Sequence, residues 1–297
     1  MNNKFSAVFI NVKTFLGNIF FWNKSNEEVK IKLEEFEVVG PYSMIRNYSK
    51  ESSIISIINK KTQALIDEIH GPICNSGHEK VIIYDIGANI GIYSLAYSKI
   101  LNSKVFSFEP FPESFNYLEK NKLFNGLNNL NIYPIGLMED TKTLTMGHPP
   151  IDYRGAFDWF KKRGDKIESG CKTIFHSSDD YKTVKCNFVR GDSILKQKLF
   201  NKLHYVKIDT EGSELFVLKG LKDTLSNMKP ILQIELNKAL MDKIGIHLTD
   251  MRDYLINLGY NKFRLFGENQ SASKEIKDIC NHVISGSKDY VFYKSKE

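Results

Sequence analysis

The sequence predicts an α/β fold, in which a mostly parallel sheet is covered by helices on both faces. From residue 81 onward, short apolar runs typical of buried strands alternate with segments of helical periodicity. Such alternation is typical of parallel sheets, whose consecutive strands are joined by helices. A content of 42% apolar and 26% charged residues in a chain of 297 is that of a folded protein.

The expected elements follow one another in a regular order. The expected strands are residues 81–84, 104–108, 130–135, 204–208 and 231–234, followed by a closing pair at residues 261–266 and 290–293. The expected helices are residues 91–101, 112–125, 213–225 and 249–258. A proline at the start of the second helix and a glycine just past the end of the last one suit those positions.

Two regions do not follow the alternation, and they set the domain boundaries that we predict. Residues 1–75 are expected to form a helical extension, with a helix near residues 51–70, and residues 76–297 the main domain. Residues 139–190 interrupt the main domain after its third strand. Because so long a stretch inside a compact domain is usually functional, we expect a loop insertion that contacts the substrate.

The segment from Phe5 to Trp22 is apolar and aromatic, with Lys13 as its single charge. It is short for a transmembrane span, and no signal-peptide cleavage site follows it. We expect it to pack on the main domain or on a second copy of the chain in a homo-oligomer. A helix that lies on the inner face of a membrane is the alternative.

Charge and cysteine content bound the partners and the compartment. A net charge of +6 is mild for this length and does not indicate a nucleic-acid partner. The four cysteines are scattered without a Cys-x-x-Cys pair, which indicates free thiols in a reducing compartment rather than a zinc site. We therefore predict a cytoplasmic protein that does not bind nucleic acid.

The first strand of the sheet ends in an acid and a glycine turn, in the stretch YDIGANIG at residues 84–91. Ligands of open parallel sheets bind beyond the carboxyl ends of the strands, and Gly87 and Gly91 allow a ligand to approach the backbone there. The dinucleotide fingerprint has a further glycine facing a pyrophosphate, which this turn lacks. Asp85 suits a ligand with an ammonium group, so S-adenosylmethionine fits the turn better than NAD. A nicotinamide-dependent dehydrogenase is the rival.

Acids also close two later strands. Glu109 follows the second strand, where a carboxylate can accept hydrogen bonds from both hydroxyls of a ribose. The stretch VKIDTEGSE at residues 206–214 places Asp209 and Glu211 where the fourth strand enters a helix. We expect both to act in the chemistry beside the cofactor, and Glu214 to interact favourably with the helix dipole.

Glu235 and Asn237 end the fifth strand at the same edge of the sheet. Together with Asp209, they could orient a substrate hydroxyl or hold a divalent cation through oxygen ligands. No histidine motif indicates a transition metal. We predict substrate-binding roles for both residues and no resident metal.

These stretches together resemble the FkbM family of S-adenosylmethionine-dependent methyltransferases, many of which O-methylate sugars, glycans or polyketide-type products. The resemblance covers roughly residues 80–260 and is carried by YDIGANIGIYSLAYSK, FSFEPFPESFNYLEKN, VRGDSIL, YVKIDTEGSELFVLKGL and PILQIELN. It implies the class I methyltransferase fold, a Rossmann-like sheet of seven strands with the last one antiparallel. By position it implies a place near the transferred methyl group for Asp209 and Glu211. The cofactor-binding residues that it implies are Asp85, Gly87, Asn89, Gly91, Glu109 and Asp192, although capping of a helix is the alternative role for Asp192.

The insertion has a composition of its own, in the stretch IDYRGAFDWFKKRGDKIESGCK at residues 151–172. Aromatic residues such as Trp159 are interleaved with cations such as Arg154. Aromatic faces can pack on sugars, and cations can bind carboxylates or phosphates, so we expect an anionic saccharide or a glycolipid as acceptor. A solvated amphipathic helix is the alternative.

The sequence as a whole predicts an enzyme that methylates a hydroxyl of a sugar, glycan or related metabolite by direct in-line transfer. Asp209 or Glu211 would accept the proton of that hydroxyl. A polyketide or other secondary metabolite is the alternative acceptor. A nucleic-acid methyltransferase is disfavoured, because GHPPI at residues 147–151 lacks the asparagine and aromatic residue of the Asn-Pro-Pro-aromatic motif. A scaffold that binds the cofactor without turnover is the non-enzymatic alternative.

Overall fold

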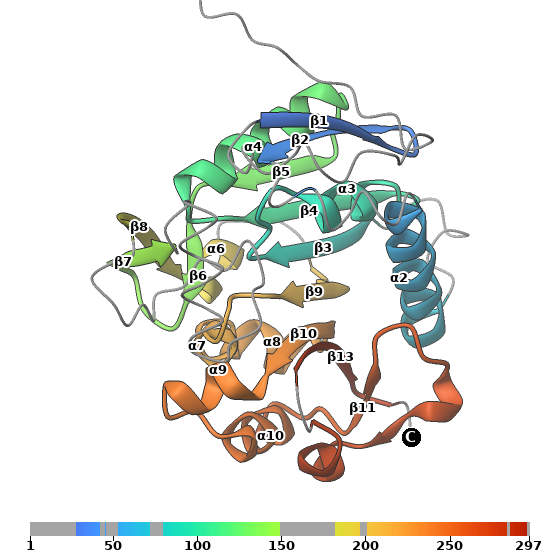
Figure 1. Ribbon diagram of the computed structural model, residues 1–297. Coiled ribbons are helices and arrows are strands. Elements are labelled where there is room, and N and C mark those ends of the chain that lie inside the picture. Colours follow the sequence, from blue (N-terminus) through green and yellow to red (C-terminus); the bar gives the residue numbers. More distant parts are fainter. Residues whose placement is uncertain are drawn as a thin grey trace, which may run out of the picture.

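The computed structural model describes residues 28–41, 45, 53–71, 80–148, 182–196, 201–283 and 286–295. Its centre is one sheet of eight strands (Figure 1). These strands are β3 (Val81–Ile86), β4 (Ser103–Phe108), β5 (Leu130–Tyr133), β9 (Tyr205–Ile208), β10 (Ile231–Asn237), β11 (Lys262–Leu265), β12 (Lys274–Glu275) and β13 (Ser287–Tyr293). Their order across the sheet is β12-β11-β13-β10-β9-β3-β4-β5.

The strand directions confirm the expected mostly parallel sheet. β5, β4, β3, β9 and β10 run parallel, whereas β13 is antiparallel to both β10 and β11, which confirms the closing pair. The sheet has one strand more than the seven expected, because β12 adds two residues beside β11, too few to show an apolar pattern. The strand order reverses between β3 and β9, so their carboxyl ends form the switch point where such sheets bind ligands.

The central strands are buried on both faces, which explains their mainly apolar sequences. In β3, Val81 and Ile83 pack in one hydrophobic core, and Ile82 and Tyr84 pack in the other. The first core includes α2 (Ile54–His70) and α3 (Ile92–Ser98); the second includes α7 (Glu214–Gly220), α8 (Lys222–Met228) and α10 (Leu248–Asn257). Helices therefore cover both faces of the sheet, as the sequence predicts.

The single helix expected at residues 213–225 is two helices, α7 and α8, which meet at Leu221. Gly220 ends α7 against the backbone of Met138, where a Cβ atom would lie 2.0 Å from the carbonyl oxygen. The amide groups that begin α8 are bound by Asp192 of α6 (Gly191–Lys196). Both causes of the break come from distant parts of the chain, so the apolar pattern of the segment does not reveal it.

The N-terminal extension is only partly helical. α2 confirms the helix expected near residues 51–70, but a hairpin of β1 (Glu28–Leu33) and β2 (Phe36–Pro41) precedes it. The side chains of Asn121 on α4 (Pro112–Phe124) and of Asn125 at its end form hydrogen bonds with the backbone of β2. The helix α4 therefore lies beside the hairpin (Figure 1). The prediction missed the hairpin because its turn, at Glu34, lacks the Asn-Gly type of signal.

A small second sheet begins with a strand just before the interruption expected at residues 139–190 and includes two strands within it. Its strands are β6 (Gly136–Met138), β7 (Lys142–His148) and β8 (Lys182–Arg190), in the order β6-β8-β7. β7 and β8 flank residues 149–181, which lie outside the described residues. Arg154 and Trp159 are among these, so their binding of substrate stays a prediction.

The segment from Phe5 to Trp22 also lies outside the described residues. In the part of the chain that the structure describes, no helix combines the length and the apolar character that crossing a membrane requires. Contact of the N-terminal segment with a membrane or a second copy of the chain therefore stays a prediction.

Candidate active site

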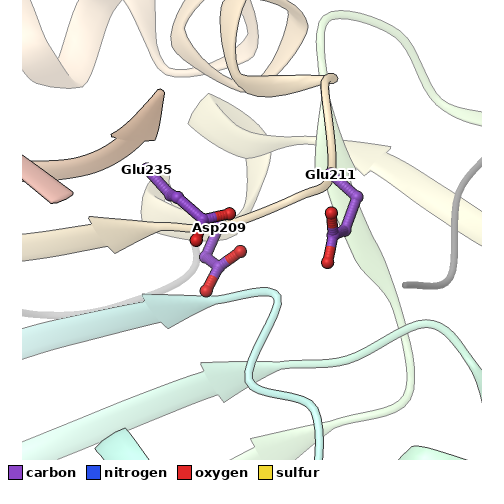
Figure 2. A group of neighbouring side chains, drawn as sticks. All are labelled: Asp209, Glu211 and Glu235. Carbon is purple, nitrogen blue, oxygen red and sulfur yellow. The ribbon is translucent and has the colours of Figure 1, made fainter. Parts of the chain in front are cut away.

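Three carboxylates meet at the carboxyl edge of the sheet, those of Asp209, Glu211 and Glu235 (Figure 2). The parallel pairing of Ile208 with Ile234 brings Asp209 and Glu235 onto neighbouring strand ends, and Glu211 lies on the turn between β9 and α7. One carboxylate oxygen from each residue lies within 4.8 Å of those of the other two. We call these three residues the acidic cluster. The sequence predicts all three at this edge, and the structure brings them together.

The crowding of like charges changes proton binding within the acidic cluster. Burial, with the nearby carboxylates of Asp209 and Glu211, raises the pKa of Glu235 to about 9. Lys207 acts in the opposite direction but does not cancel this rise in the pKa. Glu235 therefore holds a proton at neutral pH, and in that state it can donate a hydrogen bond.

Lys207 is a residue of this site that the sequence analysis missed. It lies in β9 and is buried, and its Nζ atom lies 2.6 Å from Oδ2 of Asp209. Nζ also lies 4.2 Å from the ring centroid of Tyr93 on α3. Burial alone would lower the pKa of this lysine, but Asp209, Asp289, Tyr93 and Asp85 raise the pKa well above its ordinary value. A charged residue inside an otherwise apolar strand was the signal that could have identified it.

The glycine turn after β3 has the left-handed backbone that its sequence suggests, with φ of +81° at Gly87, +50° at Asn89 and +96° at Gly91. The prediction assigns both glycines to the approach of a ligand, but the structure gives each a reason within the protein. A Cβ atom on Gly87 would lie 1.8 Å from the carbonyl oxygen of Asp209, and one on Gly91 would lie 2.6 Å from Leu118. Contact of this turn with the cofactor stays a prediction.

Asn89 and Glu109 tie the glycine turn to the end of β4. The backbone N–H of Asn89 donates to Oε2 of Glu109 at 2.8 Å, and the N–H of Phe111 donates to Oε1 at 2.9 Å. The Asn89 side chain accepts a hydrogen bond from Ser114. Glu109 thus fixes the turn through backbone amides, and its predicted contact with a ribose would be an additional one.

Asp85 lies fully buried beneath the turn, opposite Lys207 in the pairing of β3 with β9. Ser94 on α3 donates a hydrogen bond to Oδ2 of Asp85 at 2.6 Å. Burial raises the pKa of Asp85, and the positive charge of Lys207 acts in the opposite direction. The contacts of Asp85 are therefore within the protein, and its binding of the cofactor's ammonium group stays a prediction.

Glu214 closes the turn that carries Glu211. Its Oε1 atom accepts hydrogen bonds from the backbone N–H groups of Thr210 and Gly212, at 3.0 and 3.1 Å, and from the Thr210 hydroxyl. The turn needs this support because Glu211 has a φ of +53°, which is uncommon for a side chain with a Cβ atom. Glu214 also lies in the first turn of α7, as the predicted interaction with the helix dipole requires.

Two predicted ligand-binding residues serve as helix caps. Oδ1 of Asp192 accepts hydrogen bonds from the N–H and hydroxyl of Thr224, and Oδ2 accepts one from the N–H of Asp223 at the start of α8. Oδ1 of Asn237 accepts one from Leu240 at the start of α9 (Lys238–Lys243). The capping role of Asp192, the alternative that the sequence left open, is present, but in a helix other than its own. A cofactor contact of Asp192 and a substrate contact of Asn237 stay predictions.

The acidic cluster also has the dimensions of a cation site, since three oxygens within 4.8 Å of one another could share one divalent ion. Crowded acidic groups are common without a metal, however, and the ammonium of Lys207 already binds Asp209. The absence of a resident metal stays a prediction.

The comparison with family models agrees with the resemblance seen in the sequence. A family model described as the methyltransferase FkbM domain matches residues 85–262, which include both the glycine turn and the acidic cluster. The chain is also similar to a crystal structure of methyltransferase FkbM from Methylobacillus flagellatus KT, with 16% sequence identity and a TM-score of 0.43. The match covers 84% of this chain and 60% of that one.

Two curated relatives match about half of the chain. The hexuronic acid methyltransferase AglP of Haloferax volcanii is 26% identical over 162 residues, which are 54% of this chain and 58% of that protein. Methyltransferase sdnD of Sordaria araneosa is 26% identical over 157 residues, which are 48% of this chain and 60% of that protein. The chain thus spans less than two thirds of the length of the relatives that it matches.

Proposed function

Because the chain belongs to the FkbM family of methyltransferases, we propose that it transfers a methyl group from S-adenosylmethionine to a hydroxyl of a sugar, glycan or related metabolite. The observation that carries this proposal is the acidic cluster at the carboxyl edge of the sheet. It lies at the end of β9, which forms the switch point with β3, where open α/β sheets bind their ligands.

The charge of this region supports S-adenosylmethionine as the donor. Carboxyl groups gather near the strand ends, at Asp85, Asp209, Glu211, Glu235 and Asp289, all of which interact electrostatically with Lys207 or with one another. S-adenosylmethionine carries a sulfonium and an ammonium group, which such a region attracts. The pyrophosphate of NAD is an anion, which the same region repels.

The proposed reaction is a direct displacement. The acceptor oxygen attacks the methyl carbon while the carbon–sulfur bond breaks, and the bonding electron pair goes to sulfur, giving S-adenosylhomocysteine. The hydroxyl proton passes to a carboxylate, for which Asp209 is our first candidate and Glu211 the second. The protein contributes mainly by aligning oxygen, carbon and sulfur.

A sugar acceptor is supported by one relative, since AglP is described as acting on a hexuronic acid. Sugars present several hydroxyl groups, which can donate hydrogen bonds to ionised carboxylates and accept one from a protonated Glu235. The acidic cluster therefore favours an acceptor whose reacting part is neutral and rich in hydroxyl groups.

The test combines a binding and a turnover measurement. In calorimetric titration the protein should bind S-adenosylhomocysteine and not NADH. With a panel of hydroxylated glycans and glycolipids, release of S-adenosylhomocysteine should identify the acceptor. Asp209→Asn should keep cofactor binding and lose turnover by about 10²-fold or more. Asp253→Asn, at a side chain on α10 that is 59% exposed, is the matched control and should change neither. Binding of NADH alone would overturn the proposal. Full turnover in Asp209→Asn would instead exclude Asp209 as the base and leave Glu211.

A further inference from the structure

Lys207 places a positive charge in the middle of the hydrophobic sheet. Its side chain is 2% exposed, and the other residues of β9 are Tyr205, Val206 and Ile208, all fully buried. Burying an ammonium group costs several kcal/mol unless charged partners compensate it. A methionine would fill a similar space without that cost, so stability alone does not explain a lysine here.

The partners of Lys207 link the acidic cluster to α3. On one side, Nζ contacts Oδ2 of Asp209 at 2.6 Å. On another, it lies 4.2 Å from the ring centroid of Tyr93, which is within the range of a cation–π contact. The hydroxyl of Tyr93 in turn donates a hydrogen bond to Asp289 at 3.1 Å. The ammonium group of Lys207 is therefore held by both Asp209 and Tyr93.

The bond to Lys207 holds one oxygen of the Asp209 carboxylate in place. Asp209 follows the last residue of β9, and its side chain is 29% exposed, so part of it reaches the surface at the edge of the sheet. The buried end of the ion pair, by contrast, is immobilised in the core. One carboxylate oxygen is thus anchored, and the carboxylate lies beside those of Glu211 and Glu235 (Figure 2).

We propose that Lys207 is a positioning residue, which anchors Asp209 by Oδ2 and leaves Oδ1 for the hydroxyl of the methyl acceptor. This inference rests on the proposed function. Without methyl transfer, the ion pair would have a structural role only. The expected contribution is large, because a misplacement of a reacting group by about 1 Å can cost about 10²-fold in rate.

The experiment compares Lys207→Met with the wild type in the full chain, using S-adenosylmethionine and the acceptor found in the glycan screen. We expect kcat to fall by about 10²-fold, with KM for both substrates and Kd for S-adenosylhomocysteine changed by less than about 3-fold. A purely structural role would not separate kcat from KM in this way. Lys262→Met removes an exposed ion pair, with Glu275, and should leave kcat unchanged.

A double variant keeps the test decisive if Lys207→Met does not fold. Lys207→Met/Asp209→Asn removes both charges of the pair, which proteins tolerate better than the loss of one partner. If Lys207 acts through Asp209, the double variant should have the same kcat as Asp209→Asn alone. A kcat that is 10-fold lower in the double variant, or a wild-type kcat in Lys207→Met, would overturn the inference. No methyl transfer by the wild type would instead overturn the proposed function itself.

Discussion

The glycine turn and the acidic cluster lie at the same edge of one sheet, but their acids have opposite kinds of neighbours. Each carboxylate oxygen of Glu109 accepts one hydrogen bond from a backbone N–H, at 2.8 Å from Asn89 and at 2.9 Å from Phe111. Glu235 instead faces Asp209 and Glu211, which, with burial, raise its pKa. Hydrogen bonds from backbone amides offset the cost of burying an ionised carboxylate, whereas neighbouring carboxylates increase the cost of ionising it.

This difference separates acids that build the fold from acids suited to chemistry. Glu109, Asp192 and Glu214 all accept hydrogen bonds from backbone amides and so fix turns or helix ends. For Glu235, burial and the neighbouring carboxylates outweigh the opposite effects of Lys207 and Ser287 on its pKa, and crowded titratable groups of this kind gather at functional sites. A strand-end position by itself therefore does not indicate function; the partners of the carboxylate do.

The largest expected effect is that of Gly87→Ala. Its Cβ atom would lie 1.8 Å from the carbonyl oxygen of Asp209, so β3 and β9 would have to separate at their ends. We expect a loss of about 4 kcal/mol or more in the free energy of unfolding, measured in urea. Gly126→Ala is the control, since Gly126 has a φ of +60° with no atom within 4 Å of the added Cβ. Gly126→Ala should lower the free energy of unfolding by only about 1 to 2 kcal/mol. Equal losses would mean that the turn does not depend on this close approach.

Asp192→Ala should be the next most harmful, by about 3 kcal/mol in the free energy of unfolding. The change removes the acceptor of two backbone amides and of the Thr224 hydroxyl, which are largely buried. Asp250→Ala removes an exposed cap from α10 and should cost about 1 kcal/mol or less. At low temperature, Asp192→Ala should still bind S-adenosylhomocysteine. If Asp192→Ala loses that binding while its stability is unchanged, the result would support the cofactor role predicted for Asp192.

Glu235→Gln should give a smaller effect that depends on pH. Between pH 4.5 and about 9, folded Glu235 holds a proton that the unfolded chain releases, so this residue makes stability fall as pH rises. The glutamine variant lacks that loss and should gain about 1 kcal/mol or more over the wild type from pH 5 to pH 8. Urea unfolding at pH 5, 6.5 and 8 measures this gain, with the exposed Glu119→Gln as control. A constant difference across these pH values would contradict the raised pKa of Glu235.

Most of the fold could be predicted because its central strands are buried on both faces and are mainly apolar. Two of the features that escaped prediction involve contacts between distant residues. The break between α7 and α8 requires Met138 and Asp192, and the β1–β2 hairpin is completed by Asn121 of α4. None of these contacts leaves a periodic pattern in the sequence.

The candidate site divides in the same way. The acidic cluster could be predicted, because residues that follow parallel strands meet at one edge of the sheet. The charge of Lys207 within an apolar strand was a signal, but its role could not be predicted, since it depends on the burial of the side chain and on the contact of Nζ with Asp209. The helix caps made by Asp192 and Asn237 also depend on geometry, because in sequence a capping acid and a ligand-binding acid look the same.

The smallest expected effect is that of removing metal ions. Dialysis against EDTA should leave both turnover and the melting temperature unchanged, because the charge of the acidic cluster is already reduced in two ways. Lys207 binds Asp209, and Glu235 retains its proton at neutral pH. A divalent ion would have to compete with both, whereas an ion bound to the folded state alone would raise the melting temperature when added back. Loss of turnover on chelation, with recovery in Mg²⁺, would mean that a cation relieves the crowding in the cluster.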